Sequence, residues 1–178
     1  MFKVYNGRPE SIAGRTEAEI SSYDLLASLN IKYQRTEHPP ADTMDVCMQR
    51  AALLNTRICK NLFLCNRQET KFYLLLMPAE KKFKTSVVSS QLGVARLHFA
   101  DERYLRQYLG LQPGSVSILG LMYDSKNHVQ LLVDKEIPQQ EDFACHPCTN
   151  TVSLKFKTSE LFEKLIPSLK HEPFFLTL

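Results

Sequence analysis

The sequence lacks most of the features that mark export, membrane insertion or phosphate binding. None of its apolar runs is long enough to span a bilayer. The opening stretch MFKVYNGRPE has no signal-peptide apolar core, so we expect a protein that is not exported. The 6 glycines stand singly, which excludes a glycine-rich phosphate loop. With no repeat, low-complexity tract or flexible linker, we expect one domain over residues 1–178.

The number of cysteines and the net charge are both low. The 5 cysteines are an odd number, and their spread does not suggest a disulfide framework. This favours a reducing, cytoplasmic setting. The formal net charge of +3 permits a nucleic-acid partner without requiring one.

Five stretches predict helices. Thr16 and Glu19 form a capping box in which each side chain is expected to bond the other's backbone N–H, and apolar residues then follow at helical spacing up to Asn30. Thr43 can cap a second helix that runs to about Leu54. The remaining candidates are SVVSSQLG at 86–93, DERYLRQYLG at 101–110 and SELFEKLI at 159–166.

The predicted strands mix hairpins with isolated segments. NLFLC and KFYLLLMP flank a polar turn and predict a hairpin, and VSILGLMY with HVQLLVD predicts a second one. Because the order lacks regular βαβ alternation, it indicates an α+β fold with a mixed, largely antiparallel sheet. Further strands are expected in IKYQ at 31–34, RLHFA at 96–100, TVSLKF at 151–156 and FFLTL at 174–178.

The stretch FACHPCTNTVSL contains the motif Cys145-His146-Pro147-Cys148. A thiol oxidoreductase would place a helix after this motif to lower the thiol pKa, whereas TNTVSLKF alternates like a strand. A zinc site is not expected, because three crowded residues do not converge easily on one ion and no second Cys-x-x-Cys pair exists. We therefore expect no metal and no cofactor. The thiol oxidoreductase stays an alternative, and small buried cysteines are the simplest interpretation.

No serine-hydrolase signature is present, since the chain has no Gly-x-Ser-x-Gly elbow. A Cys–His pair formed in the folded chain stays open as an alternative. Lys60 stands directly before the apolar strand NLFL, where a lysine is most often a solvated strand end. His146 is, by the same reasoning, most often a loop histidine with a backbone partner.

Four motifs follow one another along the chain, namely HPPADTMDV, CKNLFLCNRQETKFYLLLM, LHFADERYLRQYLGLQPGSVSILGL and CHPCTNTVSLKFKTSELFEKL. Their most specific parts are Lys60 to Leu64, residues 109–121, and His146-Pro147 followed by Asn150-Thr151. In this order the motifs resemble the YbaK/ProX family, the free-standing relatives of the editing domain in bacterial prolyl-tRNA synthetases. The resemblance covers roughly residues 20–178.

The resemblance implies a barrel-like sheet flanked by helices and the deacylation of mischarged tRNA. Members of the ProX branch remove alanine from tRNA(Pro), and YbaK-type members remove cysteine. The motifs look closer to the ProX branch, so alanyl-tRNA(Pro) is the expected substrate and cysteinyl-tRNA(Pro) the alternative. The implied partners are the acceptor end of mischarged tRNA and prolyl-tRNA synthetase. A module that binds tRNA without cleaving it is the remaining alternative.

The resemblance also assigns residues. Lys60 matches the functional lysine, and His146 matches the histidine of the pocket loop. The attacking group would be water, with oxyanion donors from backbone N–H groups near Gly120 or His146 and help from the substrate's ribose hydroxyl. The sequence departs from the family at Cys145 and Cys148, which bears on the width of the pocket. The implied substrate-binding residues are Asn61, Gly120, Leu121, Pro147, Asn150 and Thr43.

Overall fold

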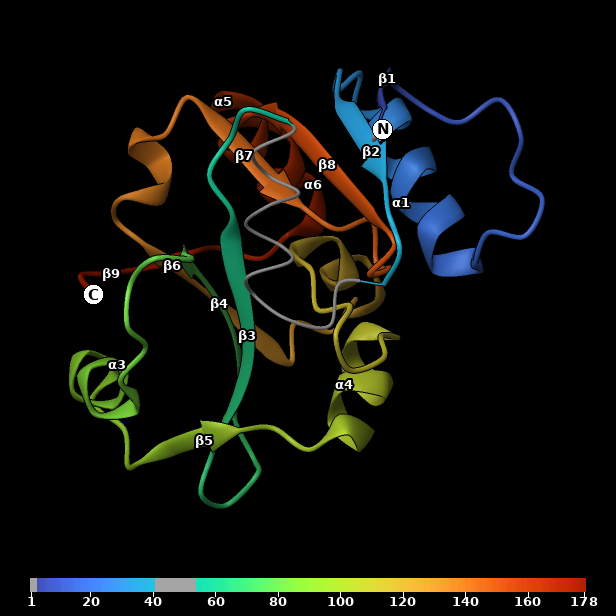
Figure 1. Ribbon diagram of the computed structural model, residues 1–178. Coiled ribbons are helices and arrows are strands. Elements are labelled where there is room, and N and C mark those ends of the chain that lie inside the picture. The colour runs from blue at the N-terminus through green and yellow to red at the C-terminus, as the bar shows by residue number, and fades with distance from the viewer. Residues whose placement is uncertain (1–2, 41–53) are drawn as a thin grey trace.

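The computed structural model describes residues 3–40 and 54–178, and within these ranges the strands form two sheets surrounded by helices (Figure 1). The four-stranded sheet has the order β1-β2-β8-β7, and all its neighbours are antiparallel. Its strands are β1 (Val4–Asn6), β2 (Gln34–Glu37), β7 (Asp142–Cys145) and β8 (Val152–Lys157).

The five-stranded sheet has the order β5-β3-β4-β6-β9. The β3–β4 and β3–β5 pairs are antiparallel, whereas β6 runs parallel to both β4 and β9. The mixed, largely antiparallel α+β prediction is therefore confirmed, with the strands divided between two sheets and not closed into one barrel. The strands are β3 (Cys59–Asn66), β4 (Phe72–Pro78), β5 (Leu97–Phe99), β6 (Val129–Asp134) and β9 (Phe174–Leu176).

The first predicted hairpin, β3–β4, is confirmed. Its turn is held by Asn66, whose Oδ1 accepts the backbone N–H groups of Thr70 and Lys71, both at 2.9 Å. Every residue of β4 is buried because both faces of this sheet are covered. Leu74 and Leu76 belong to the larger of two hydrophobic clusters, and the alternate residues of β4 belong to the smaller one.

The predicted helices within the described residues are present. Thr16 caps α1 by accepting the Glu19 N–H at 3.2 Å, as expected, but the Glu19 carboxylate accepts from Arg15 and Tyr23 and not from Thr16. The predicted helix from Thr43 lies outside the described residues. The helices are α1 (Glu17–Ser28), α3 (Thr85–Leu92), α4 (Glu102–Leu109), and a C-terminal run of α5 (Thr158–Glu160), the π-helical turn η3 (Leu161–Leu165) and α6 (Ile166–Leu169).

The second predicted hairpin is wrong. VSILGLMY contains the 3₁₀ helix η1 (Ile118–Tyr123), and β6 pairs with β4 in parallel. Ser117 starts η1 by accepting the Leu119 N–H. Asp124 follows η1 and accepts the backbone N–H groups of His128 and Val129 at the start of β6. A short run that is apolar almost throughout carries no periodicity to separate helix from strand. A further 3₁₀ turn, η2 (Ile137–Gln139), follows β6.

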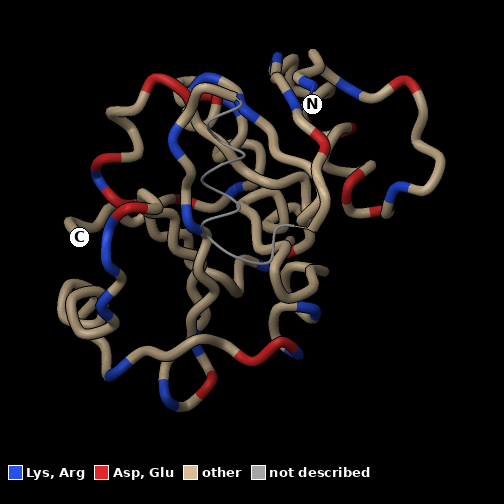
Figure 2. The backbone as a smooth tube through the Cα atoms, viewed as in Figure 1, with Lys and Arg blue, Asp and Glu red and all other residues tan. Residues whose placement is uncertain are grey.

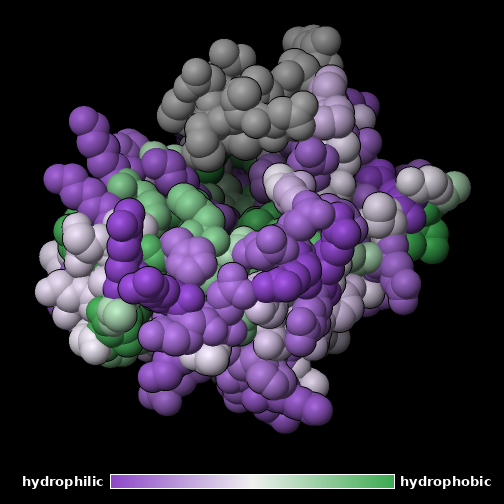
Figure 3. All heavy atoms as spheres, turned by 90° about the horizontal axis from the view of Figure 1, so that it is seen from below, coloured by the Kyte–Doolittle hydropathy of each residue, from purple (hydrophilic) through white to green (hydrophobic). Residues whose placement is uncertain are grey.

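The outer surface carries both signs of charge. Lysine and arginine alternate with aspartate and glutamate around the outer loops (Figure 2). Seen from below, apolar side chains lie at the bottom of a hollow that polar side chains border (Figure 3). In residues 3–40 and 54–178, no helix is long and apolar enough to cross a membrane.

Candidate functional site

The Cys145–Cys148 motif forms the turn between β7 and β8. Ser117 holds the turn from η1, because its hydroxyl donates to the His146 carbonyl at 2.6 Å. Cys148 has a φ of 58°, a left-handed conformation that allows the chain to reverse here. The strand expected after Cys148 is present as β8, and the helix that a redox motif requires at this position is not.

The His146 ring has a defined protonation pattern. Its Nδ1 lies 2.7 Å from the Val152 carbonyl, which only accepts, so Nδ1 carries the proton. Burial lowers the pKa of His146, and the nearby His38 ring lowers it further. The hydrogen bond to the Val152 carbonyl raises the pKa but is outweighed. Nε2 has no hydrogen-bond partner among the described residues. His146 therefore presents a neutral ring nitrogen that accepts hydrogen bonds.

A second histidine lies beside the first. The ring centroids of His38 and His146 are 6.2 Å apart with the planes at 66°. His38 is buried, its Nδ1 lies 2.9 Å from the Pro39 carbonyl, and its Nε2 lies 2.9 Å from the Ser153 hydroxyl of β8. Neither His38 nor Ser153 is among the site residues predicted from the sequence. The one sequence signal for His38 is its position as the first residue of the HPPADTMDV motif.

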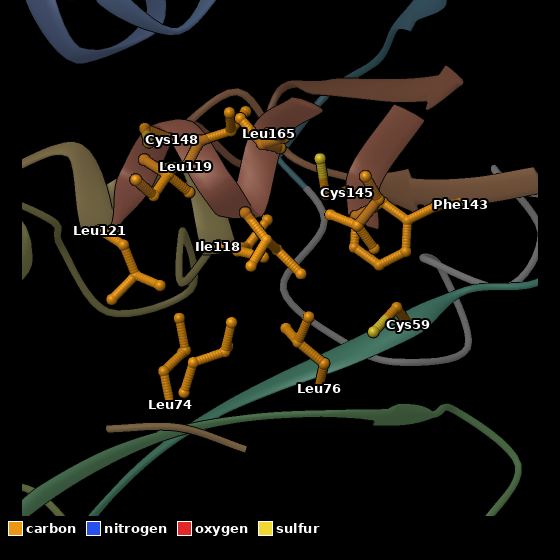
Figure 4. Close-up of a cluster of buried hydrophobic side chains, with 14 of the residues drawn as sticks. Cys59, Leu74, Leu76, Ile118, Leu119, Leu121, Phe143, Cys145, Cys148 and Leu165 are labelled. Atoms are coloured by element: carbon orange, nitrogen blue, oxygen red, sulfur yellow. The ribbon is translucent and has the colours of Figure 1, made fainter. Parts of the chain in front are cut away.

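A small cavity of about 20 Å³ lies between the two sheets at this point. Its walls are mainly apolar, with the imidazole of His146 and the hydroxyl of Ser153 as polar groups. Cys59 on β3 and Cys145 on β7 approach it from different sheets (Figure 4). The lining residues are Leu54, Ile58, Cys59, Ala144, Cys145, His146 and Ser153.

Lys60 points away from this cavity. Side chains alternate along a strand, and in β3 both Cys59 and Phe63 belong to the larger cluster, whereas Leu62 contacts the smaller one. Lys60 shares the face of Leu62, and its Nζ donates to the Lys81 carbonyl at 2.9 Å. The structure therefore does not bring the two predicted catalytic residues, Lys60 and His146, together.

Asn61 lies on the same face of β3 as Cys59. Its Nδ2 donates to the Cys59 carbonyl at 3.2 Å. Its Oδ1 is buried and has no hydrogen-bond partner in the part of the chain that the structure describes. An unsatisfied buried acceptor is costly, so this oxygen is available to a donor that enters from the cavity side.

Gly120 is a packing residue in this structure. A Cβ at this position would lie 2.7 Å from Cδ1 of Leu111, and the Gly120 N–H already donates to the Ser117 carbonyl. The hypothesis that this N–H binds an oxyanion therefore gains no support. Leu121 and Pro147 are buried, and the Asn150 side chain makes no hydrogen bond within the described residues. Thr43 lies outside them.

The described cysteines are buried and unpaired, namely Cys59, Cys65, Cys145 and Cys148. Burial raises the pKa of the Cys145 thiol, and it raises the pKa of Cys148 to about 11. A hydrogen bond with Ser22 lowers the Cys148 pKa but does not offset the effect of burial. These thiols stay protonated at neutral pH. In residues 3–40 and 54–178, no group of three or more side chains is placed to hold a metal ion.

We expect the Cys148→Ala variant to keep most of the deacylation rate proposed below. A dithiol mechanism needs both cysteines of the motif, whereas a buried cysteine outside the cavity contributes packing only. The measurement is the single-turnover rate with and without reductant. Cys65→Ala, which changes a buried cysteine of the five-stranded sheet, is the matched control. A folded Cys148→Ala protein without activity would assign the thiols to the chemistry.

The fold and this site define a domain of the tRNA-editing class. Residues 38–164 match the family model described as the aminoacyl-tRNA editing domain. The chain belongs to this family, which confirms the resemblance found in the sequence.

Individual relatives agree with this assignment. The prolyl-tRNA editing protein ProX of Acetoanaerobium sticklandii is 30% identical, and the alignment covers 79% of this chain and 85% of that protein. Prolyl-tRNA synthetase associated domain-containing protein 1 of Danio rerio is 27% identical over 86% of this chain and 84% of its own. A crystal structure described as a candidate trans-editing enzyme for prolyl-tRNA synthetase superposes with a TM-score of 0.67 at 14% identity, covering 92% of this chain and 98% of the other, and shows the shared fold.

Proposed function

We propose that the protein is a trans-editing hydrolase that deacylates mischarged tRNA, with alanyl-tRNA(Pro) as its main substrate. The observation that carries this proposal is the small, mainly apolar cavity beside His146 and Ser153. Its volume of about 20 Å³ suits a group the size of a methyl or a water. The ProX relative, described as a prolyl-tRNA editing protein, supports the same substrate class.

Selection among aminoacyl groups would be steric. The alanine methyl group enters the cavity, and the proline ring meets Ile58, Cys59 and Cys145 at its walls. Overpacking a filled site costs about 1–3 kcal/mol, and rejection grows when the walls cannot move. Serine is the difficult competitor, because an added hydroxyl is poorly rejected on size alone.

The chemistry needs placement more than strong catalysis, because an aminoacyl ester is already activated. Water attacks the ester carbonyl. His146 Nε2, a neutral acceptor, takes a hydrogen bond from the ribose hydroxyl of the terminal adenosine. Lys60 leaves the Lys81 carbonyl to hold the terminal phosphate or the ester carbonyl, and Asn61 Oδ1 accepts from the substrate's ammonium group. Leu121, Pro147 and Asn150 support the pocket loop.

The proposed partner is the acceptor end of mischarged tRNA, and prolyl-tRNA synthetase is a second proposed partner in the cytoplasm. The net charge is +3, and Figure 2 shows lysines and arginines dispersed among acidic residues along the described backbone. Such contacts bind phosphates and weaken as salt rises. We take residues 1–178 as the single domain that carries this activity.

The test is a set of single-turnover rates on alanyl-, cysteinyl-, seryl- and prolyl-tRNA(Pro). We expect alanyl-tRNA(Pro) to be hydrolysed fastest and prolyl-tRNA(Pro) to survive, because the cavity excludes the larger ring. If cysteinyl-tRNA(Pro) is fastest, the substrate is of the YbaK type. If none is hydrolysed although tRNA binds, the protein is a binding module.

A further inference from the structure

We propose that Ser153 and His38 together take the proton from the attacking water. The proposal rests on the proposed function and adds a residue pair to its site. The pair joins two segments 115 residues apart, since His38 follows β2 and Ser153 lies on the neighbouring strand β8. The arrangement is that of a base aligned with a hydroxyl and oriented by a third group.

The third group is the Pro39 carbonyl. A carbonyl only accepts, so the 2.9 Å contact fixes the proton of His38 on Nδ1. The Nε2 lone pair of the neutral ring then faces Ser153, whose hydroxyl donates to it at 2.9 Å. The Nδ1–H bond also stabilises the ring when Nε2 becomes protonated. The structure thus sets up the tautomer that a general base requires before any substrate binds.

Ser153 is oriented by the same bond. Because its only proton points to His38, the lone pairs of its oxygen are free to accept from a water at the cavity. Ser153 lines the cavity proposed for the alanine methyl group, together with Ala144 and His146. With the methyl group inside, the ester carbonyl carbon lies at the mouth, next to the Ser153 oxygen. A water held there has its own oxygen lone pair directed at that carbon.

The step balances without a further reactant. As the water oxygen bonds to the carbonyl carbon, one water proton passes to Ser153 Oγ and the Ser153 proton passes to His38 Nε2. The bond between the carbonyl carbon and the ribose oxygen then breaks. The ribose oxygen takes a proton back from His38 through Ser153. Alanine and the free tRNA 3′ end leave, and the pair returns to its starting state.

The other candidate bases are less well placed. His146 Nε2 is the proposed partner of the ribose hydroxyl, and burial, together with the His38 ring 6.2 Å away, lowers the pKa of His146. Lys60 lies on the far face of β3 and is bound to the Lys81 carbonyl. The thiol of Cys145 is protonated because burial raises its pKa.

The experiment measures single-turnover hydrolysis of labelled alanyl-tRNA(Pro), with tRNA binding and thermal unfolding as parallel readouts. We expect Ser153→Ala and His38→Asn to lower the rate by about 100-fold or more, the usual range for a lost general base, while tRNA binding stays unchanged. Asparagine keeps a donor for the Pro39 carbonyl and removes Nε2. Added imidazole should restore part of the rate to His38→Ala. Ser28→Ala and His98→Asn, both exposed and away from the cavity, are the matched controls.

Four outcomes overturn the pair, and the last of them overturns the proposed function as well. Near-wild-type rates in folded Ser153→Ala and His38→Asn would refute the role of the pair, while the proposed function would remain supported. Labelled alanine that stays on the acid-quenched protein would make Ser153 a covalent nucleophile and not a relay. Nitrogen NMR of the substrate-free protein that finds His38 protonated on Nε2 alone would contradict the geometry directly. A wild-type protein that hydrolyses none of the esters would overturn the proposed function and this step with it.

Discussion

Replacing Lys60 by alanine is expected to abolish deacylation while the fold stays intact. The Lys60 Nζ has one hydrogen bond, to the Lys81 carbonyl, and makes no ion pair with a described residue. Its removal therefore costs little stability, about 0.5–1.5 kcal/mol for one such bond. Loss of a cation that meets the phosphate or the developing oxyanion would lower the single-turnover rate by about 100-fold or more. The rate on alanyl-tRNA(Pro) and the melting temperature measure the two effects separately.

Lys82→Ala is the matched control, because Lys82 is an exposed lysine on the turn after β4. It should leave both the rate and the melting temperature unchanged. The Lys60 result also decides between two descriptions of the site. Full activity in Lys60→Ala would confine the chemistry to the cavity face of β3, where Asn61 and Cys59 lie. Loss of activity would mean that Lys60 exchanges the Lys81 carbonyl for the substrate.

The sequence predicts local structure well where side chains act on their own backbone. The Thr16 cap, the left-handed Gly93 and Gly110 after their helices, and the β3–β4 hairpin all depend on residues within a few positions of each other. A continuous apolar run gives no such local signal. The apolar residues of η1 are therefore predicted as a strand, although tertiary packing makes them a 3₁₀ helix.

The candidate site depends on contacts that no local pattern encodes. His38 and Ser153 meet only because β2 pairs with β8, in a register that aligns Thr36 with Ser153. The family resemblance indicates Lys60 and His146, but only strand alternation in the fold shows that Lys60 lies on the face of β3 away from the cavity that His146 lines. Gly120 illustrates a second limit. A glycine at this position is expected both where the residue lines a pocket and where it packs closely against Leu111. Only the structure distinguishes these two explanations.

Asp124 illustrates how such long-range contacts support the fold. Its carboxylate accepts the backbone N–H groups of His128 and Val129 at 3.0 and 2.7 Å, and the Nε2 of His171 at 3.1 Å. The other ring nitrogen of His171, Nδ1, lies 2.6 Å from the Leu169 carbonyl, so the ring bridges Asp124 and the backbone after the C-terminal helical run. Both members of this pair are buried. It ties the loop before β6 to the segment that leads into β9.

The Asp124→Ala variant should lose about 3 kcal/mol or more of unfolding free energy, since removal of the carboxylate leaves the buried His171 ring and two backbone N–H groups without their acceptor. Urea denaturation measures this loss, and Asp24→Ala, which breaks an exposed pair with Arg8, should lose at most about 1 kcal/mol.

Burial would raise the pKa of Asp124, but hydrogen bonds from His171, Val129 and His128 outweigh it and lower the pKa. The carboxylate therefore stabilises the fold fully above its ordinary pKa of about 3.9, and this contribution is lost as the pH falls through the lower folded-state pKa. The difference between wild type and Asp124→Ala should shrink in that acidic range, and a difference that grows there would refute the assignment.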